Sequence, residues 1–274
     1  MEINEPSPSE IQRFARVLTI AGSDSGGCAG IQADLRTFAT LQTHGLCAVT
    51  SITAQDTEKV HSCFDIPERL VSEQIKVVLD DIGADAVKTG MLSSSAIIGA
   101  VASQLRRYKV NRLVVDPVMA ATGGGQFIDP EAIHDLVLQL FPLAAVITPN
   151  LQEAEVLLER SLRTSEELRL GAQDLHRLGP RSVIIKGGHI DDPDHSTDLL
   201  YDGSEFHLLT GPRIRTSNTH GSGCTFAAAI AAYLARGLPI VSAAFKAREY
   251  VQRAIQYSYP LGKGNGPLGH FGAG

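Results

Sequence analysis

The sequence predicts an α/β protein with a mainly parallel central sheet and helices on both faces. Short apolar segments alternate with longer segments of helical spacing along the chain. The apolar segments are nearly continuous hydrophobic runs, which is typical of parallel strands buried on both faces. No internal repeat and no low-complexity linker interrupts this alternation, so we expect a single domain over residues 17–274.

The first half of the chain begins with a strand, a glycine-rich turn and a helix. Leu70, Ile75 and Val78 recur at helical spacing. Ser93 is placed to cap a helix, and Pro130 stands in a first helical turn. The predicted strands are 17–21, 47–53, 84–88 and 112–116. The predicted helices are 30–41, 67–81, 93–108 and 130–141.

The second half continues the pattern and adds a hairpin. Asp202-Gly203 separates two short apolar segments and predicts a tight β-turn, and Gly237 and Pro239 separate two helices. The predicted strands are 145–148, 182–186, 198–201 and 205–209. The predicted helices are 151–159, 164–178, 221–236 and 239–257. We expect the tail after Gly262 to be an ordered loop or a frayed end.

The composition excludes several classes of protein. A net charge of −6 at pH 7 argues against a nucleic-acid partner. No apolar run approaches the roughly 20 residues of a membrane-spanning helix. Residues 1–16 contain Glu2, Glu5 and Glu10 and do not resemble a signal peptide, so we expect a disordered extension and a cytoplasmic protein. The four cysteines show no C-x-x-C spacing, which leaves a zinc or thioredoxin-like site unsupported.

Two glycine-rich turns are candidates for ligand binding. Residues 21–30 follow the first strand but lack the spacing of a dinucleotide fingerprint or a P-loop, so they could equally be a tight turn that needs positive φ. Residues 218–226 open a helix whose first N–H groups could hold an anion. Cys224 falls in its first turn, where the helix dipole favours a thiolate; the alternative is a small buried cysteine.

Polar residues also follow successive predicted strands. Asp116, Asn150 and Glu153 could hold hydrated Mg²⁺, and Lys186 before Gly187 could reach a phosphate. Asn150 could instead be only a helix cap, and Lys186 could be solvated. Because ligands of open α/β sheets bind beyond the carboxyl ends of the strands, their joint placement is more informative than any one of them.

Together these segments resemble the ribokinase-like small-molecule kinases, and among them the hydroxymethylpyrimidine/phosphomethylpyrimidine kinases of thiamine biosynthesis. The resemblance runs in the family's order over about residues 17–271. It rests on Leu18-Thr-Ile-Ala-Gly-Ser-Asp-Ser-Gly-Gly27, Ala29-Gly-Ile-Gln-Ala-Asp34, Thr53-Ala-Gln-Asp56, Lys88-Thr-Gly-Met-Leu92, Asp116-Pro-Val-Met119, Thr148-Pro-Asn150, Lys186-Gly-Gly-His189 and Asn218-Thr-His-Gly-Ser-Gly-Cys-Thr225. It implies a ribokinase-like three-layer sandwich, ATP as co-substrate, Mg²⁺ and a homodimer.

The resemblance also implies a role for each site residue. The residues implied to bind the pyrimidine are Gly22, Ala29, Gln55, Met91 and Val118. Those implied for ATP are Lys186, Asn150 and Thr219, and those for Mg²⁺, largely through water, are Glu153 and Asp116. Cys224 matches the general base, within a turn formed by Gly221 and Gly223. One departure is Cys28, at a position that is usually glycine in this motif.

Two rival functions remain open at this point. Some relatives phosphorylate pyridoxal, but those specialised for it tend to lack the glutamine at position 55 and to carry cysteine where this chain has Ala121. A non-catalytic nucleotide-binding regulator is the other alternative. The presence of Lys186, Glu153 and Cys224 argues against it, and ATP turnover with and without an alcohol acceptor distinguishes the two.

Overall fold

The computed structural model describes residues 14–119, 128–187 and 194–273, and within them the chain builds one nine-stranded sheet of order β3-β2-β1-β4-β5-β6-β7-β8-β9. The strands from β2 to β7 are parallel, and β3, β8 and β9 add antiparallel edges. The strands are β1 (Arg16–Asp24), β2 (His44–Gln55), β3 (Val60–Asp65), β4 (Ala86–Thr89), β5 (Leu113–Val115), β6 (Val146–Ile147), β7 (Val183–Ile185), β8 (His195–Tyr201) and β9 (Phe206–Pro212).

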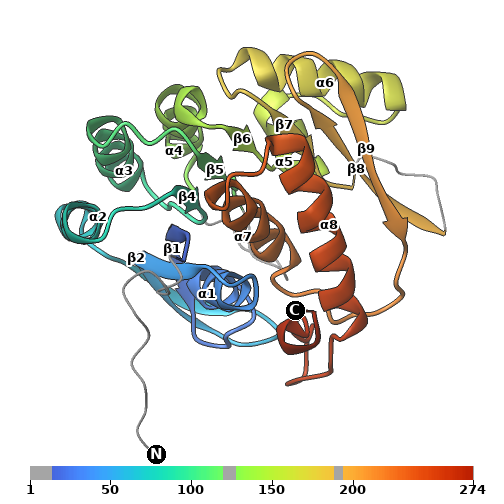
Figure 1. Ribbon diagram of the computed structural model, residues 1–274, viewed down its shortest axis with the longest axis horizontal. Coiled ribbons are helices and arrows are strands. Elements are labelled where there is room, and N and C mark those ends of the chain that lie inside the picture. The colour runs from blue at the N-terminus through green and yellow to red at the C-terminus, as the bar shows by residue number, and fades with distance from the viewer. Residues whose placement is uncertain (1–13, 120–127, 188–193, 274) are drawn as a thin grey trace, which may run out of the picture.

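Helices cover both faces of this sheet, which confirms the three-layer architecture (Figure 1). On one face, α1 (Gly30–Thr40), α7 (Ser222–Ala235) and α8 (Ile240–Gln256) enclose one apolar core. On the other face, a second core lies under α2 (Glu68–Asp81), α3 (Ser95–Arg107), α4 (Pro130–Asp135), α5 (Leu151–Leu158) and α6 (Ser165–Arg177). No helix among the described residues is long and apolar enough to cross a membrane.

Helix α7 is the central helix of its layer. Alanine is its commonest residue, and every residue from Thr225 to Ala235 is buried. Small side chains let α7 lie close to α1, α8 and the sheet at once. This packing fixes the start of α7 at the carboxyl end of the parallel strands, where the glycine-rich turn of residues 218–221 leads into it.

The structure corrects several expected elements. The segment 130–141 is α-helical only over Pro130–Asp135, then forms a π-helical turn (Leu136–Leu140) and a 3₁₀ turn (Phe141–Leu143). Pro142 has no N–H and its ring crowds the preceding turn, so regular α-helical bonding cannot continue through it. Strand β3 was not expected, because its mostly exposed residues carry no hydrophobic alternation. The strand expected from residue 84 begins at Ala86.

Both ends of the chain bear on the expected domain boundary. Strand β1 begins at Arg16, which hydrogen-bonds to Asp85, so the ordered domain starts earlier than residue 17. Of the expected disordered extension, residues 1–16, residues 1–13 lie outside the described residues. The tail is an ordered loop: Thr57 accepts N–H groups from Lys263 and Gly264.

Candidate active site

A cavity of about 490 Å³ lies beyond the carboxyl ends of the parallel strands. Such a position is where open α/β sheets bind ligands. Every residue named above as a site candidate lines it. These residues are Gly22, Ala29, Gln55, Met91, Asp116, Val118, Asn150, Glu153, Lys186, Thr219, Gly221, Gly223 and Cys224.

The first glycine-rich turn is organised by Asp24. Its carboxylate accepts the backbone N–H groups of Gly26, Cys28 and Ala29, each at 2.8 Å. These donors are therefore used within the turn and cannot bind an external anion. The turn serves instead to bring main chain against the cavity. Gly30 has φ +57, and a Cβ on it would lie 2.5 Å from the Gly22 carbonyl oxygen, so only glycine fits there.

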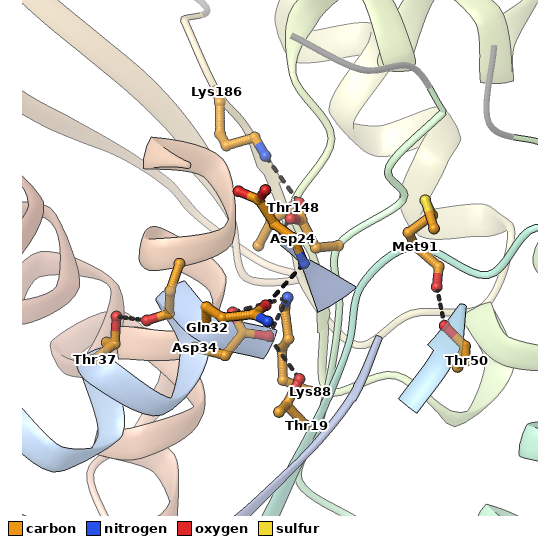
Figure 2. A network of polar contacts seen from close by, with 12 residues as sticks. Thr19, Asp24, Gln32, Asp34, Thr37, Thr50, Lys88, Met91, Thr148 and Lys186 are labelled. Atoms are coloured by element: carbon orange, nitrogen blue, oxygen red, sulfur yellow. Dashed lines mark hydrogen bonds and ion pairs between the residues drawn. The ribbon is translucent and has the colours of Figure 1, made fainter. Parts of the chain in front are cut away.

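Flat apolar surface and one polar edge meet at the β1–β2 end of the cavity. A Cβ on Gly22 would lie 2.6 Å from Cε of Met91, so glycine is needed for this methionine to lie across the turn. The Thr50 hydroxyl donates to the Met91 carbonyl and fixes its backbone (Figure 2). Beside it, the Gln55 carboxamide hydrogen-bonds to the His220 ring at 3.1 Å. This end can hold a planar ring and read one of its edges.

The second glycine-rich turn is packed directly against the first. Gly221 has φ +82, and a Cβ there would lie 1.9 Å from the Cys28 carbonyl oxygen. Only glycine allows this conformation and this approach. The Ser222 N–H donates to the Thr219 carbonyl, whereas Gly223 and Cys224 follow within the first turn of α7, where N–H groups have no partner inside the helix. The turn therefore offers donors for an anion.

The structure contradicts the expected ionisation of Cys224. Burial raises the pKa of its thiol to about 11, and the opposing effect of the Lys88 ammonium is smaller. The position is as predicted, in the first turn of α7 on the cavity wall. The expectation that the helix N-terminus makes it a thiolate is wrong, because loss of hydration outweighs the favourable charges around it.

Beneath the thiol lies a buried ion pair that sequence reasoning missed. Lys88 donates to both carboxylate oxygens of Asp34, at 3.0 and 2.8 Å, and Thr19 donates to the same carboxylate at 2.6 Å (Figure 2). Burial opposes the charge on Lys88, but Asp34 raises the pKa of the ammonium well above its usual range. A lysine inside a strand, where only apolar residues are expected, was the available signal.

The phosphate-binding candidates lie at the ends of β5, β6 and β7. Lys186 donates to Asp116 at 2.9 Å, and Thr148 donates to the same oxygen at 3.0 Å. A Cβ on Gly223 would lie 3.1 Å from the Lys186 Nζ atom, so the ammonium lies beside the first turn of α7. Cation and helix N-terminus therefore converge, an arrangement that binds phosphate.

Asn150 and Glu153 form a capping box at the start of α5. The Asn150 side chain accepts the Glu153 N–H at 2.8 Å, and Glu153 accepts the Asn150 N–H at 2.7 Å. Burial raises the pKa of Glu153 to about 7, against the opposing effect of Lys186. Although burial disfavours the Asp116 carboxylate, Lys186 and Lys88 hold its pKa below the usual range.

These carboxylates define what metal the site fits. Within residues 14–119, 128–187 and 194–273, no group of three or more His, Cys, Asp and Glu side chains could hold a metal ion. Asp116 and Glu153 are also partly engaged with Lys186 and with backbone. Such a donor set fits Mg²⁺, which keeps several waters and is shared with substrate phosphates, better than a metal bound wholly by protein.

A second ion pair missed by sequence reasoning lines the cavity near β8. Asp198 lies 3.3 Å from Arg248 and also accepts the Gly187 N–H at 2.8 Å. Arg248 donates further to the Ser196 carbonyl at 2.6 Å. No motif marks these residues, because strand β8 and helix α8 bring them together only in the folded chain.

Two residues used in the sequence analysis, Ala121 and His189, lie outside the described residues.

Comparison with known proteins identifies consistent relatives. A family model described as phosphomethylpyrimidine kinase matches residues 24–269. A hydroxymethylpyrimidine/phosphomethylpyrimidine kinase of Mycobacterium tuberculosis is 46% identical over 92% of this chain and 92% of its own length. A thiamine biosynthesis bifunctional protein of Geobacter sulfurreducens is 49% identical over 93% of this chain, which spans 52% of that longer protein.

Solved structures give the same fold. The ADP complex of Bacillus subtilis pyridoxal kinase superposes with a TM-score of 0.87 at 40% identity, covering 95% of this chain and 98% of that one. A phosphomethylpyrimidine kinase of Clostridium difficile superposes with a TM-score of 0.78 at 38% identity, covering 88% and 99%. Both kinds of kinase therefore share this architecture.

Proposed function

The chain belongs to the phosphomethylpyrimidine kinase family, and from this premise we propose that it transfers the γ-phosphoryl group of ATP to 4-amino-5-hydroxymethyl-2-methylpyrimidine and then to the resulting monophosphate, within thiamine diphosphate biosynthesis. One observation carries the proposal. A single cavity holds an edge-reading amide, Gln55, at one end and a phosphate-binding pair, Lys186 with the α7 N-terminus, towards the other. Cys224 lies on its wall in that same first turn.

The proposed acceptor subsite is built for a flat, apolar ring with one polar edge. Gly22 and Ala29 contribute backbone without bulk, and Met91 and Val118 contribute apolar surface. The Gln55 carboxamide carries a donor and an acceptor, which match the amino group and ring nitrogen of an aminopyrimidine. Such pairing orients the hydroxymethyl group towards Cys224.

At the other end, Lys186, Asn150 and Thr219 are proposed to bind the nucleotide, and Gly221 and Gly223 to let the α7 N-terminus approach its terminal phosphate. The phosphoryl transition state is loose, so positioning and charge neutralisation dominate. Glu153 and Asp116 would hold Mg²⁺ largely through water, and the ion when bound would neutralise phosphate charge. The N–H groups of α7 and the Lys186 ammonium act on the same oxygens.

Cys224 is proposed as the group that receives the proton of the acceptor hydroxyl. With the pKa of the thiol at about 11, this role requires that the assembled site lower that pKa. The Lys88 ammonium favours the thiolate, and this effect is already contained in that pKa. The hydroxyl proton leaves late in a loose transition state, which reduces the basicity that the thiolate has to supply.

The main alternative is a pyridoxal kinase, or a kinase with both activities, since solved pyridoxal kinases share the fold. Gln55, which relatives specialised for pyridoxal tend to lack, favours the pyrimidine. The experiment incubates the protein with ATP and Mg²⁺ and with either the pyrimidine alcohol or pyridoxal, and follows the products by mass spectrometry. We expect pyrimidine monophosphate followed by pyrophosphate. Faster phosphorylation of pyridoxal would establish the alternative, and ATP turnover by neither would favour the non-catalytic regulator.

We also propose a homodimer. Ile52 and Phe64, on the β2–β3 edge of the sheet, expose 52% and 67% of their surface, which is apolar area suited to a second copy. Light scattering at several protein concentrations tests this, and Phe64→Ser should shift the protein towards monomer. The cytoplasmic location expected from the sequence stays a prediction.

A further inference from the structure

His220 lies between the two parts of the proposed site without an assigned role. Its side chain is 3% exposed, and its Nε2 atom lies 3.1 Å from the Nε2 atom of Gln55. Because the carboxamide nitrogen can only donate, the facing ring nitrogen must accept, which leaves the ring proton on Nδ1. Burial lowers the pKa of His220, while Asp24 acts in the opposite direction. The ring is therefore neutral, as this hydrogen bond requires.

The other end of the Gln55 carboxamide has a weaker partner. Its Oε1 atom lies 3.3 Å from the Thr53 hydroxyl, which also donates to the Ser23 carbonyl at 2.8 Å. A hydroxyl can accept as well as donate, so Thr53 tolerates either orientation of the amide. Neutral His220 with its proton on Nδ1 does not, since a rotated amide would set its oxygen against the unprotonated Nε2 atom.

The C-terminal tail holds the backbone at His220. The backbone N–H of His220 donates to the Gly266 carbonyl at 3.2 Å, and the Gly266 N–H donates to the Asn218 side chain at 3.2 Å. The Asn265 carbonyl of the same tail favours a proton on the ring, although Nδ1 itself has no hydrogen-bond partner among the described residues. The same tail bonds to Thr57, two residues beyond Gln55, through the N–H groups of Lys263 and Gly264. One segment thus ties the end of β2 to the turn that precedes α7, and so sets the distance between Gln55 and His220.

We propose that His220 is a positioning residue that determines substrate specificity by holding the Gln55 carboxamide in one of its two orientations. The inference rests on the proposed function, since it concerns how the pyrimidine edge is read. With Nε2 donating one hydrogen to His220, Gln55 keeps its second N–H and a free lone pair on Oε1 for the ring. Rotation of the amide would exchange these two positions and present the wrong pattern to the aminopyrimidine.

The test compares His220→Gln, which keeps an acceptor at about the reach of Nε2, with His220→Met, which has similar length and no acceptor. We expect His220→Met to raise the KM for the pyrimidine about tenfold, the loss of one buried hydrogen bond, with the KM for ATP unchanged. His220→Gln should restore most of the loss. When Gln55→Ala is also present, His220→Met and His220→Gln should have the same KM for the pyrimidine.

Each other result decides against the proposal. Equal KM values for the Met and Gln variants, or the same fold-difference in the Gln55→Ala background, would show that His220 does not act through Gln55. His270→Ala is the control, because His270 is also 3% exposed but contacts Tyr250, outside the cavity. A loss in His220→Met matched by this control would mean general destabilisation. A wild-type protein that turns over no pyrimidine would overturn both the proposed function and this inference.

Discussion

The ammonium of Lys88 lies 2.8 Å from a carboxylate oxygen of Asp34, and neither side chain has any exposed surface. The pair joins β4 to α1 beneath the turn that carries Cys224. Burial raises the pKa of the Asp34 carboxyl against the opposing effect of Lys88, so the Asp34 carboxylate depends on this ammonium, and removing one partner leaves the other buried without compensation.

We therefore expect Lys88→Met to lower the free energy of unfolding by about 3–5 kcal/mol. Asp34 would be left without its counter-ion. Combining Lys88→Met with Asp34→Asn should restore much of the stability, because the uncompensated charge is removed. Chemical denaturation of both variants measures this. A single variant as stable as wild type would show that the ion pair does not contribute to the fold as described.

Cys224 should react with a neutral alkylating reagent slowly at pH 7. With the pKa of its thiol at about 11, the thiolate fraction should grow about tenfold per pH unit up to that value. Peptide mapping after timed exposure follows this residue separately from the exposed Cys63. A rate that stops rising below pH 9 would mean that the α7 N-terminus outweighs burial after all.

Replacing Cys224 should affect catalysis more than nucleotide binding. Cys224→Ala is expected to lower kcat by at least about tenfold to a hundredfold, at or below the lower end of the range for loss of a general base, because the transition state is loose. Cys224→Asp, which supplies a carboxylate at the same position, should keep part of the activity. Steady-state kinetics with ATP titrated separately provides the measurement. Near-normal turnover by Cys224→Ala would leave a packing role as the better account.

Glu153→Gln should raise the Mg²⁺ concentration needed for half-maximal activity. The amide keeps the size of the side chain and can still accept the Asn150 N–H, so the capping box should survive while the ionisable carboxyl group is lost. Circular dichroism checks that the fold is kept, and a Mg²⁺ titration of the reaction rate measures the change in metal requirement. An unchanged titration would remove Glu153 from the proposed metal site.

Stability should fall in mild acid, in part because of His270. Burial lowers the pKa of this ring from 6.5 to about 4 in the folded protein. The unfolded chain therefore binds a proton that the folded chain rejects, and stability is lost as pH falls from about 6.5 to about 4, by at most about 3 kcal/mol. His270→Asn keeps an acceptor for the Tyr250 hydroxyl and does not titrate, so its melting temperature should depend less on pH over that window. The same pH dependence of the melting temperature in wild type and His270→Asn would contradict this prediction.

Much of the fold follows from local sequence. Continuous apolar runs such as Leu113–Val115 form the buried strands. Asn150 caps the helix that follows β6, and the cap expected at Ser93 is made one residue later, by Ser94. Polar residues such as Asp116 and Lys186 follow strands and so meet at one edge of the sheet, because parallel strands end together. The site candidates could be gathered from the sequence for this reason, and the order of their motifs indicated the family.

Only the tertiary structure decided how these groups behave. Asp24 takes up the amides of its own turn, His220 meets Gln55 across 165 positions of sequence, and Arg248 reaches Asp198 from another element. The charge state of Cys224 depends on how much water the folded chain removes and how near it brings Lys88. Local pattern specifies which face of an element is apolar, but desolvation and Coulomb interactions depend on distances between segments that only packing sets.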